Sequence, residues 1–145
     1  MNWKLPCALF GLVLVLNVSA FAQCTWCTSV TDACCDGQHS STDYTLPCAT
    51  STIYYHYNGT ANNEVEILIY NVTGGSEVFV VSNVGTEICD CARTQIYSGA
   101  TIASGDILRF KVNCKGCDET CDNGKITVRF FTPSTNNCAP ICVGS

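Results

Sequence analysis

Apolar and polar residues alternate in two segments near the C-terminal end of the chain. Across Asp106–Asn113 every second side chain is apolar, and Lys125–Thr132 repeats the pattern. This period of two is typical of a strand with one face buried and one face in water. The apolar members are Leu108, Phe110 and Val112 in the first segment, and Ile126, Val128 and Phe130 in the second.

Three further strands are predicted at Ile53–Tyr57, Glu64–Tyr70 and Glu77–Ser82. Each is a run of β-branched and aromatic residues followed by turn formers, such as Asn58-Gly59 and Gly74-Gly75. No window has helical periodicity. Short strands separated by turns favour an all-β fold, a small antiparallel sandwich or a jelly-roll-like domain. Both faces of the segment 64–72 are apolar, so the pattern does not decide which face is buried.

Residues 1–22 have the layout of a signal peptide. Lys4 supplies the positive charge, Leu9–Val18 supplies the apolar region, and Ala20-Phe21-Ala22 fits the small residues of a cleavage site. A membrane anchor is the alternative, but spanning a bilayer takes about 20 apolar residues and polar positions interrupt this run. We therefore expect residues 23–145 to form a single disulfide-rich β domain, secreted to the extracellular space, with no membrane span after cleavage.

Cysteine is unusually frequent, with 13 in 145 residues. Cys7 lies in the predicted signal, which leaves an even number in the exported chain and favours a framework of disulfides. Spacing alone does not determine the pairing. Ala49–Ile88 contains no cysteine, so we expect this middle part to form a core held by burial, with the ends cross-linked onto it. The predicted disulfide cysteines are Cys24, Cys27, Cys34, Cys35, Cys48, Cys89, Cys91, Cys114, Cys117, Cys121, Cys138 and Cys142.

Two C-x-x-C pairs, Cys24–Cys27 and Cys114–Cys117, allow other chemistry. This spacing occurs in redox dithiols and in half of a structural zinc site. A redox dithiol needs its first cysteine at a helix N-terminus, and no helix is predicted here. The separation of the pairs is also far from the usual zinc-site spacing. Structural disulfides are the favoured interpretation, and no metal or other cofactor is predicted.

Charge and length exclude several classes of protein. The formal net charge is -5, and the seven Lys and Arg residues never cluster, which argues against binding to nucleic acid. The length allows one ordinary domain. His39 or His56 could join Asp36 or Asp43 and a serine in a catalytic triad, but no G-x-S-x-G motif is present.

Paired carboxylates offer a second catalytic possibility. Glu64 and Glu66 share a strand face and could act in glycoside cleavage, although such a pair is ordinarily a solvated face. An enzyme is therefore not predicted.

Three kinds of binding or modification site are candidates. Asp118, Glu119 and Asp122 form an acidic loop that could hold Ca²⁺ weakly, although its spacing is not that of an EF-hand. Asn58 and Asn71 begin N-glycosylation sequons near predicted strand ends. Four aromatic residues could form an exposed patch for a sugar or a protein partner: Trp26, Tyr54, Tyr55 and Tyr57.

These features favour a secreted, disulfide-stabilised and N-glycosylated protein without catalytic activity. The preferred role is an extracellular matrix, coat or surface-associated component, with an extracellular protein or polysaccharide as partner. The alternative is a secreted recognition module or effector, such as a sugar-binding, defence or toxin-like protein. A small secreted hydrolase is less favoured. A matrix component would be found in insoluble material or in higher assemblies, whereas a recognition module would bind a defined ligand saturably.

Overall fold

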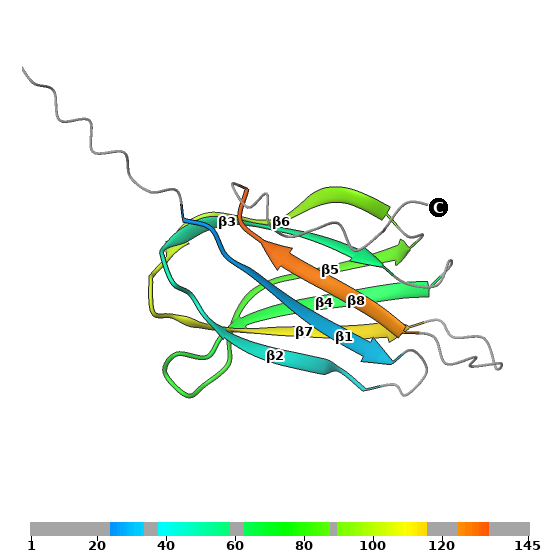
Figure 1. Ribbon diagram of the computed structural model, residues 1–145. Coiled ribbons are helices and arrows are strands. Elements are labelled where there is room, and N and C mark those ends of the chain that lie inside the picture. The colour runs from blue at the N-terminus through cyan, green and yellow to red at the C-terminus, as the bar shows by residue number, and fades with distance from the viewer. Residues whose placement is uncertain (1–23, 34–37, 59–62, 88–89, 116–124, 134–145) are drawn as a thin grey trace, which may run out of the picture.

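The described residues form eight antiparallel strands in two facing sheets (Figure 1). The computed structural model describes residues 24–33, 38–58, 63–87, 90–115 and 125–133. The strands are β1 (Cys27–Ala33), β2 (Ser40–Thr45), β3 (Thr50–Asn58), β4 (Asn63–Asn71), β5 (Val78–Glu87), β6 (Asp90–Ile102), β7 (Ile107–Lys115) and β8 (Lys125–Phe131). The predicted all-β antiparallel sandwich is confirmed.

Strands from both ends of the chain mix within each sheet. Sheet A has the order β1-β8-β3-β6, and sheet B has the order β2-β7-β4-β5. The first described strand thus lies beside the last, and in Figure 1 β1 (blue) and β8 (orange) run next to each other across the front of the molecule. Most strand pairs join segments far apart in sequence, so the first and last described strands are built into the same sheet.

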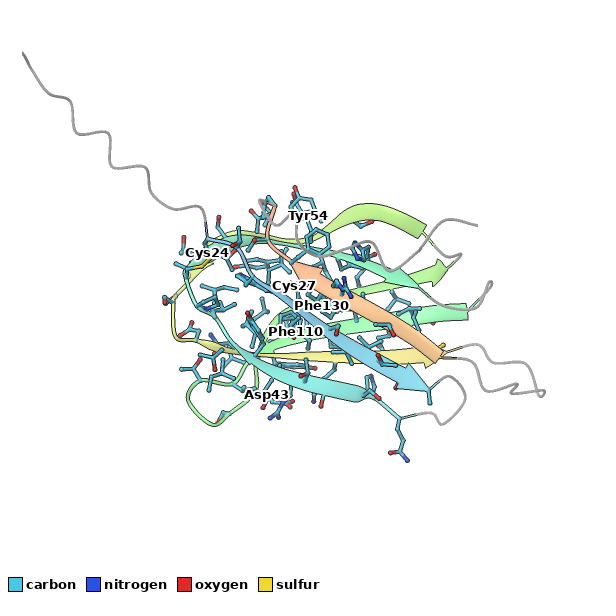
Figure 2. All side chains as sticks on the ribbon, in the orientation of Figure 1. Cys24, Cys27, Asp43, Tyr54, Phe110 and Phe130 are labelled. Atoms are coloured by element: carbon cyan, nitrogen blue, oxygen red, sulfur yellow. A yellow bond between two sulfur atoms is a disulfide. The ribbon has the colours of Figure 1, made fainter. Side chains whose placement is uncertain are left out.

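The core lies between the sheets and is lined by alternate residues of the strands. Phe110 of sheet B and Phe130 of sheet A meet there with ring centroids 4.4 Å apart (Figure 2). Trp26 packs against the same side of the core, with its ring centroid 6.1 Å from that of Phe110. The expectation that the core is confined to the cysteine-free middle is therefore wrong. Strands on both sides of that middle supply buried side chains, such as Val30 of β1 before it and Phe110 and Phe130 after it, because every strand of a sandwich has one inward face.

The inner face of β4, which the sequence left undecided, is the face of Val65, Ile67 and Ile69. These three side chains are buried, whereas Leu68 and Tyr70 on the other face are half-buried. β4 is a central strand of sheet B, between β7 and β5, so neighbouring side chains partly cover its outer face too. This position explains why both of its faces are apolar.

All five predicted strands are present, and the predicted turn at Gly74-Gly75 connects β4 to β5. Gly75 has a φ of 81°, a conformation that favours glycine, and its N–H donates to the carbonyl of Val72 (2.9 Å). β1, β2 and β6 were not predicted. Among the described residues there is no helix long and apolar enough to cross a membrane.

Candidate functional site

A disulfide joins Cys24, just before β1, to Cys48, in the connection between β2 and β3. Their Cα atoms are 5.7 Å apart, and the bridge closes a loop between residues 24 positions apart in sequence. Because β2 belongs to sheet B and β3 to sheet A, the bridge fixes the N-terminal segment at the crossing between the sheets (Figure 2). This position suits a structural cross-link.

The same bridge decides the chemistry of the first C-x-x-C pair. Cys24 is bonded to Cys48, and Cys27 is bonded to a different cysteine, so the two cysteines of the motif do not pair with each other. Cys114 is also disulfide-bonded. Cysteines in disulfides carry no thiolate, so these four could not act as zinc ligands in this state. Within the described part of the chain, no group of three His, Cys, Asp or Glu side chains is placed to hold a metal ion.

Four charged side chains form a network on the outer face of sheet B. Arg109 on β7 donates from Nε to Oδ1 of Asp43 and from Nη2 to Oδ2, both at 2.7 Å. Its Nη1 donates to Oε1 of Glu77 at 3.0 Å, and Lys111 Nζ lies 2.7 Å from the same oxygen. Two cations and two carboxylates thus neutralise one another across β2, β7 and the residue just before β5.

This network shifts the ionisation of its members. The hydrogen bond from Arg109 holds the pKa of Asp43 below its ordinary value of 3.8. Hydrogen bonds from Lys111 and then from Arg109 lower the pKa of Glu77 below 4.5. The pKa of Arg109 is raised, chiefly by its bond to Asp43. All of these side chains are partly exposed to solvent, so the network is best understood as surface stabilisation.

Lys111 also connects the charged network to an aromatic pair. Its Nζ lies 4.9 Å from the centroid of the Tyr70 ring, within the range of a cation–π contact. Tyr70 in turn meets Phe79 of β5 edge to face, with ring centroids 5.9 Å apart. Charged and aromatic side chains therefore form one continuous surface over β7, β4 and β5.

His39 pairs with Glu66 on the outer face of sheet B. His39 Nε2 lies 3.2 Å from Glu66 Oε2, and the side chains are 36% and 20% exposed. Asn113 is paired with Glu66 in the register of β7 and β4 and is itself buried. Its Oδ1 has no hydrogen-bond partner among the described residues. The structure thus brings one proposed catalytic histidine together with one proposed carboxylate.

The other proposed catalytic residues lie elsewhere. His56 is buried, with its ring centroid 5.0 Å from that of Phe131, so it packs among aromatic rings. Both carboxylate oxygens of Asp43 accept hydrogen bonds from Arg109. Glu64 is half-buried on the outer face of β4, next to Glu66 on that face. Asp36 lies outside the described residues.

The predicted sequon at Asn71 lies in a hydrogen-bonded cluster where β4 ends. Asn71 Oδ1 accepts from the N–H of Thr73 (3.0 Å) and from its hydroxyl (2.6 Å), and the Thr73 hydroxyl oxygen accepts from the N–H of Ile107 (2.8 Å). Asn71 Nδ2, the atom that would carry a glycan, donates to Asp106 Oδ2 (3.0 Å). Both sequon residues therefore hold the β4–β5 loop against the start of β7.

The predicted aromatic patch is divided between core and surface. Trp26 and Tyr55 are buried, at 3% and 4% exposure, so they do not form an exposed face. Tyr54 is half-buried on the outer face of sheet A, where its hydroxyl donates to Gln95 Oε1 (3.2 Å) and its ring stacks on Phe131. The side chain of Tyr57 lies outside the described residues. The expectation of an exposed four-residue patch is therefore wrong. Tyr55 lies on the inward face of β3, and Trp26 packs into the core next to Phe110, so neither side chain reaches the surface.

Several other predicted sites cannot be placed. The calcium loop of Asp118, Glu119 and Asp122 lies outside the described residues, and so does the side chain of Asn58. Seven of the predicted disulfide cysteines also lie outside the described residues: Cys34, Cys35, Cys89, Cys117, Cys121, Cys138 and Cys142. Cys91 lies on β6, but its side chain is outside the described part of the structure.

Asp32 is a buried carboxylate that the sequence analysis did not single out. It is fully buried, and it accepts from the N–H groups of Ser40 (3.2 Å) and Cys114 (2.8 Å). Asp32 lies on β1 of sheet A, whereas Ser40 and Cys114 lie on β2 and β7 of sheet B. It therefore joins the two sheets. Its one sequence signal is its place two residues after Val30, on the same strand face.

No protein-family model matches the chain, and no curated protein matches it. The function is therefore argued from the described residues and from the sequence.

Proposed function

We propose that the mature chain is a secreted, N-glycosylated and disulfide-stabilised structural protein that belongs to an extracellular matrix, a coat or another surface-associated assembly. The observation that carries this proposal is that several polar side chains form hydrogen bonds between parts of the fold. Asp32 holds the two sheets together, Asp43 and Arg109 join β2 to β7, and Asn71 fixes a loop. These polar side chains are thus engaged in stabilising contacts.

The disulfides support the same role. Cys24, Cys27, Cys48 and Cys114 are all bridged, which is the state expected of a protein that works in an oxidising compartment. A bridge such as Cys24–Cys48 constrains the unfolded chain, and this favours long persistence outside the cell. Extracellular protein or polysaccharide remains the proposed class of partner.

The alternative role, a secreted recognition module or effector, has less support. Its strongest sequence argument was an aromatic patch, and two of the four residues are buried in the core. Tyr54 is half-buried and could still contribute to a smaller contact surface. We retain this role as an outcome of the test below.

Fractionation of the native secreted material tests the proposal. Extracellular material is separated into a soluble fraction and a fraction that resists salt and detergent, and the protein is quantified in each by peptide mass spectrometry. A structural component should be enriched in the resistant fraction or in high-mass assemblies. Recovery as a free monomer that binds one protein or glycan from a panel saturably would overturn the proposal and favour the recognition role.

A further inference from the structure

His39, Asn113 and Glu66 form one row across sheet B. Glu66 on β4 is directly opposed to Asn113 on β7, and Ser40, the first residue of β2, is opposed to Val112. His39 directly precedes Ser40, so the same antiparallel register puts it level with Asn113 on the other side of β7. β7 therefore carries Asn113 between His39 and Glu66.

The three side chains of this row point to the outer face of the sheet. Side chains four positions apart on a strand point to the same side. His39 lies four residues before Asp43, whose hydrogen bonds with Arg109 lie on the outer face. Asn113 lies four residues after Arg109. Glu66 contacts His39 directly, so it lies on this face as well.

The contact between His39 and Glu66 passes over Asn113. Neighbouring strands lie about 4.8 Å apart, so the backbones of His39 and Glu66 are two strand spacings apart, with β7 between them. Their side chains nevertheless approach to 3.2 Å, from Nε2 to Oε2. Asn113 is only 6% exposed although it points outward, and its Oδ1 has no hydrogen-bond partner among the described residues. A buried amide oxygen thus lies beneath an imidazole and a carboxylate.

We propose that this row binds a divalent metal ion of the zinc type through His39 Nε2, Glu66 Oε2 and Asn113 Oδ1. Imidazole is a good ligand for Zn²⁺, whereas Ca²⁺ and Mg²⁺ prefer sites made of oxygen alone. Ligand atoms bind Zn²⁺ at about 2.0–2.2 Å, which places two of them about 3.4 Å apart in a tetrahedral site. The 3.2 Å between His39 Nε2 and Glu66 Oε2 is close to this separation. The third donor is an amide, so the site needs no third His, Cys, Asp or Glu, and the described residues supply none here.

A bound cation would also satisfy the oxygen of Asn113. A buried acceptor without a partner is costly, and a cation beside it supplies the missing interaction. Binding replaces the direct contact between His39 and Glu66 by two bonds to the metal, and His39 then keeps its hydrogen on Nδ1. The side chains of His39 and Glu66 are 36% and 20% exposed, so the ion has access from solvent. Three protein ligands leave a further position for water.

The zinc affinity of the mature, disulfide-intact protein tests the site. Competition with a chromophoric chelator measures the dissociation constant for Zn²⁺ alone. The wild-type protein should bind zinc saturably, and His39→Ala and Glu66→Gln should each raise the dissociation constant by about tenfold or more, because each removes a ligand. Glu64→Gln is the matched control. It removes the same charge from the same face of β4 and should change the constant by less than about twofold.

Two substitutions of Asn113 test the third ligand with opposite signs. Asn113→Asp keeps the shape and adds a carboxylate, so it should lower the dissociation constant by about tenfold, whereas Asn113→Leu removes the oxygen and should raise it by about as much. Thermal unfolding without zinc shows that each variant is folded. Asn113→Leu should not lower the melting temperature of the zinc-free protein, because it deletes an acceptor that has no partner there. Unchanged zinc affinity in both variants would overturn the assignment of Asn113.

Histidine ¹⁵N NMR gives a second readout that does not depend on affinity. The chain has two histidines, and His56, packed against Phe131, is the internal control. Zinc should shift the Nε2 resonance of His39 and leave that of His56 unchanged. The absence of binding at millimolar zinc overturns the proposal, and so does binding that survives both His39→Ala and Glu66→Gln. Equal effects of Glu64→Gln and Glu66→Gln would also overturn it, since attraction by the acidic face would then explain the binding.

This inference does not rest on the proposed structural role. Failure to bind zinc would leave that role standing, and enrichment of the protein in the soluble fraction would leave the metal site standing.

Discussion

Arg109 and Asp43 are joined by two parallel hydrogen bonds, Nε to Oδ1 and Nη2 to Oδ2, each 2.7 Å long. The two residues are 66 positions apart in sequence and directly opposed in the register of β7 and β2. The pair fixes the edge strand β2 to its neighbour, and its fork-to-fork geometry is the strong form of the Arg–carboxylate contact.

This pair predicts a dependence of stability on pH. The pKa of Asp43 is lower in the folded protein than its ordinary value of 3.8, so its contribution is present above that value and is lost as the pH falls through the folded-state pKa. Asp43→Asn should therefore reduce the free energy of unfolding near neutral pH. The difference between variant and wild type should become smaller as the pH falls below about 4. Denaturant titrations at several pH values measure the difference.

A double-mutant cycle checks that Arg109 is the cause. In the Arg109→Gln background, Asp43→Asn should have little further effect at neutral pH. An undiminished effect in that background would mean that the carboxylate acts through another partner.

Asp32 should be far more sensitive to substitution than its exposed neighbours. Asp32→Ala removes the acceptor of one buried and one partly buried N–H group, and an unsatisfied buried group costs about 1–3 kcal/mol, so we expect a loss of about 2–4 kcal/mol in the free energy of unfolding. Ser29→Ala, at an exposed position on the same strand, should change it by less than about 0.5 kcal/mol. Equal effects of the two variants in denaturant unfolding would contradict this role of Asp32.

The aromatic contact between the sheets gives a third prediction. Phe110 and Phe130 are fully buried with ring centroids 4.4 Å apart, so Phe110→Ala should leave a cavity and cost about 3–5 kcal/mol. Phe79→Ala, at a position that is 58% exposed, is the control and should cost much less. Thermal unfolding of both variants with the disulfides intact measures the contrast.

Loss of the Cys24–Cys48 bridge should weaken the fold without changing its topology. A bridge between residues 24 positions apart stabilises by about 3 kcal/mol in the chain-entropy account. The double variant Cys24→Ala/Cys48→Ala avoids a free thiol and should unfold at correspondingly lower denaturant. An unchanged midpoint would show that this bridge is not part of the stabilising framework.

The strands that could be predicted carry a strong local signal, either a run of β-branched and aromatic residues before turn formers or a regular alternation of apolar and polar residues. β7 shows this best, because its inward residues Leu108, Phe110 and Val112 are all fully buried and its outward neighbours are polar. β2, with the sequence SSTDYT, presents polar residues on both faces and gives no such signal. β6 carries register shifts against β3, which interrupt any simple period of two. The sequence therefore predicted the fold class but missed three strands.

The side-chain contacts of the candidate site depend on which strands pair and in which register. The local sequence pattern of a strand does not contain this information. Asp43 and Arg109 look like ordinary surface charges in the sequence, and only the register of β2 and β7 opposes them. In the same way, His39, which directly precedes β2, contacts Glu66 of β4 and not Asp43, because long-range pairing of the strands sets which residues meet. The exposure of Phe79 and Val84 follows from the edge position of β5, which the order of strands in the sheet decides.

The most direct test of the account is the intact mass of the natively secreted, deglycosylated protein, measured with and without reduction and after thiol labelling under denaturing, metal-free conditions. The account predicts a chain that begins at Gln23, gains twelve hydrogens on reduction for six disulfides, and takes up no label before reduction. A chain that retains residues 1–22, or that carries free thiols able to bind metal or to cycle between redox states, would contradict it.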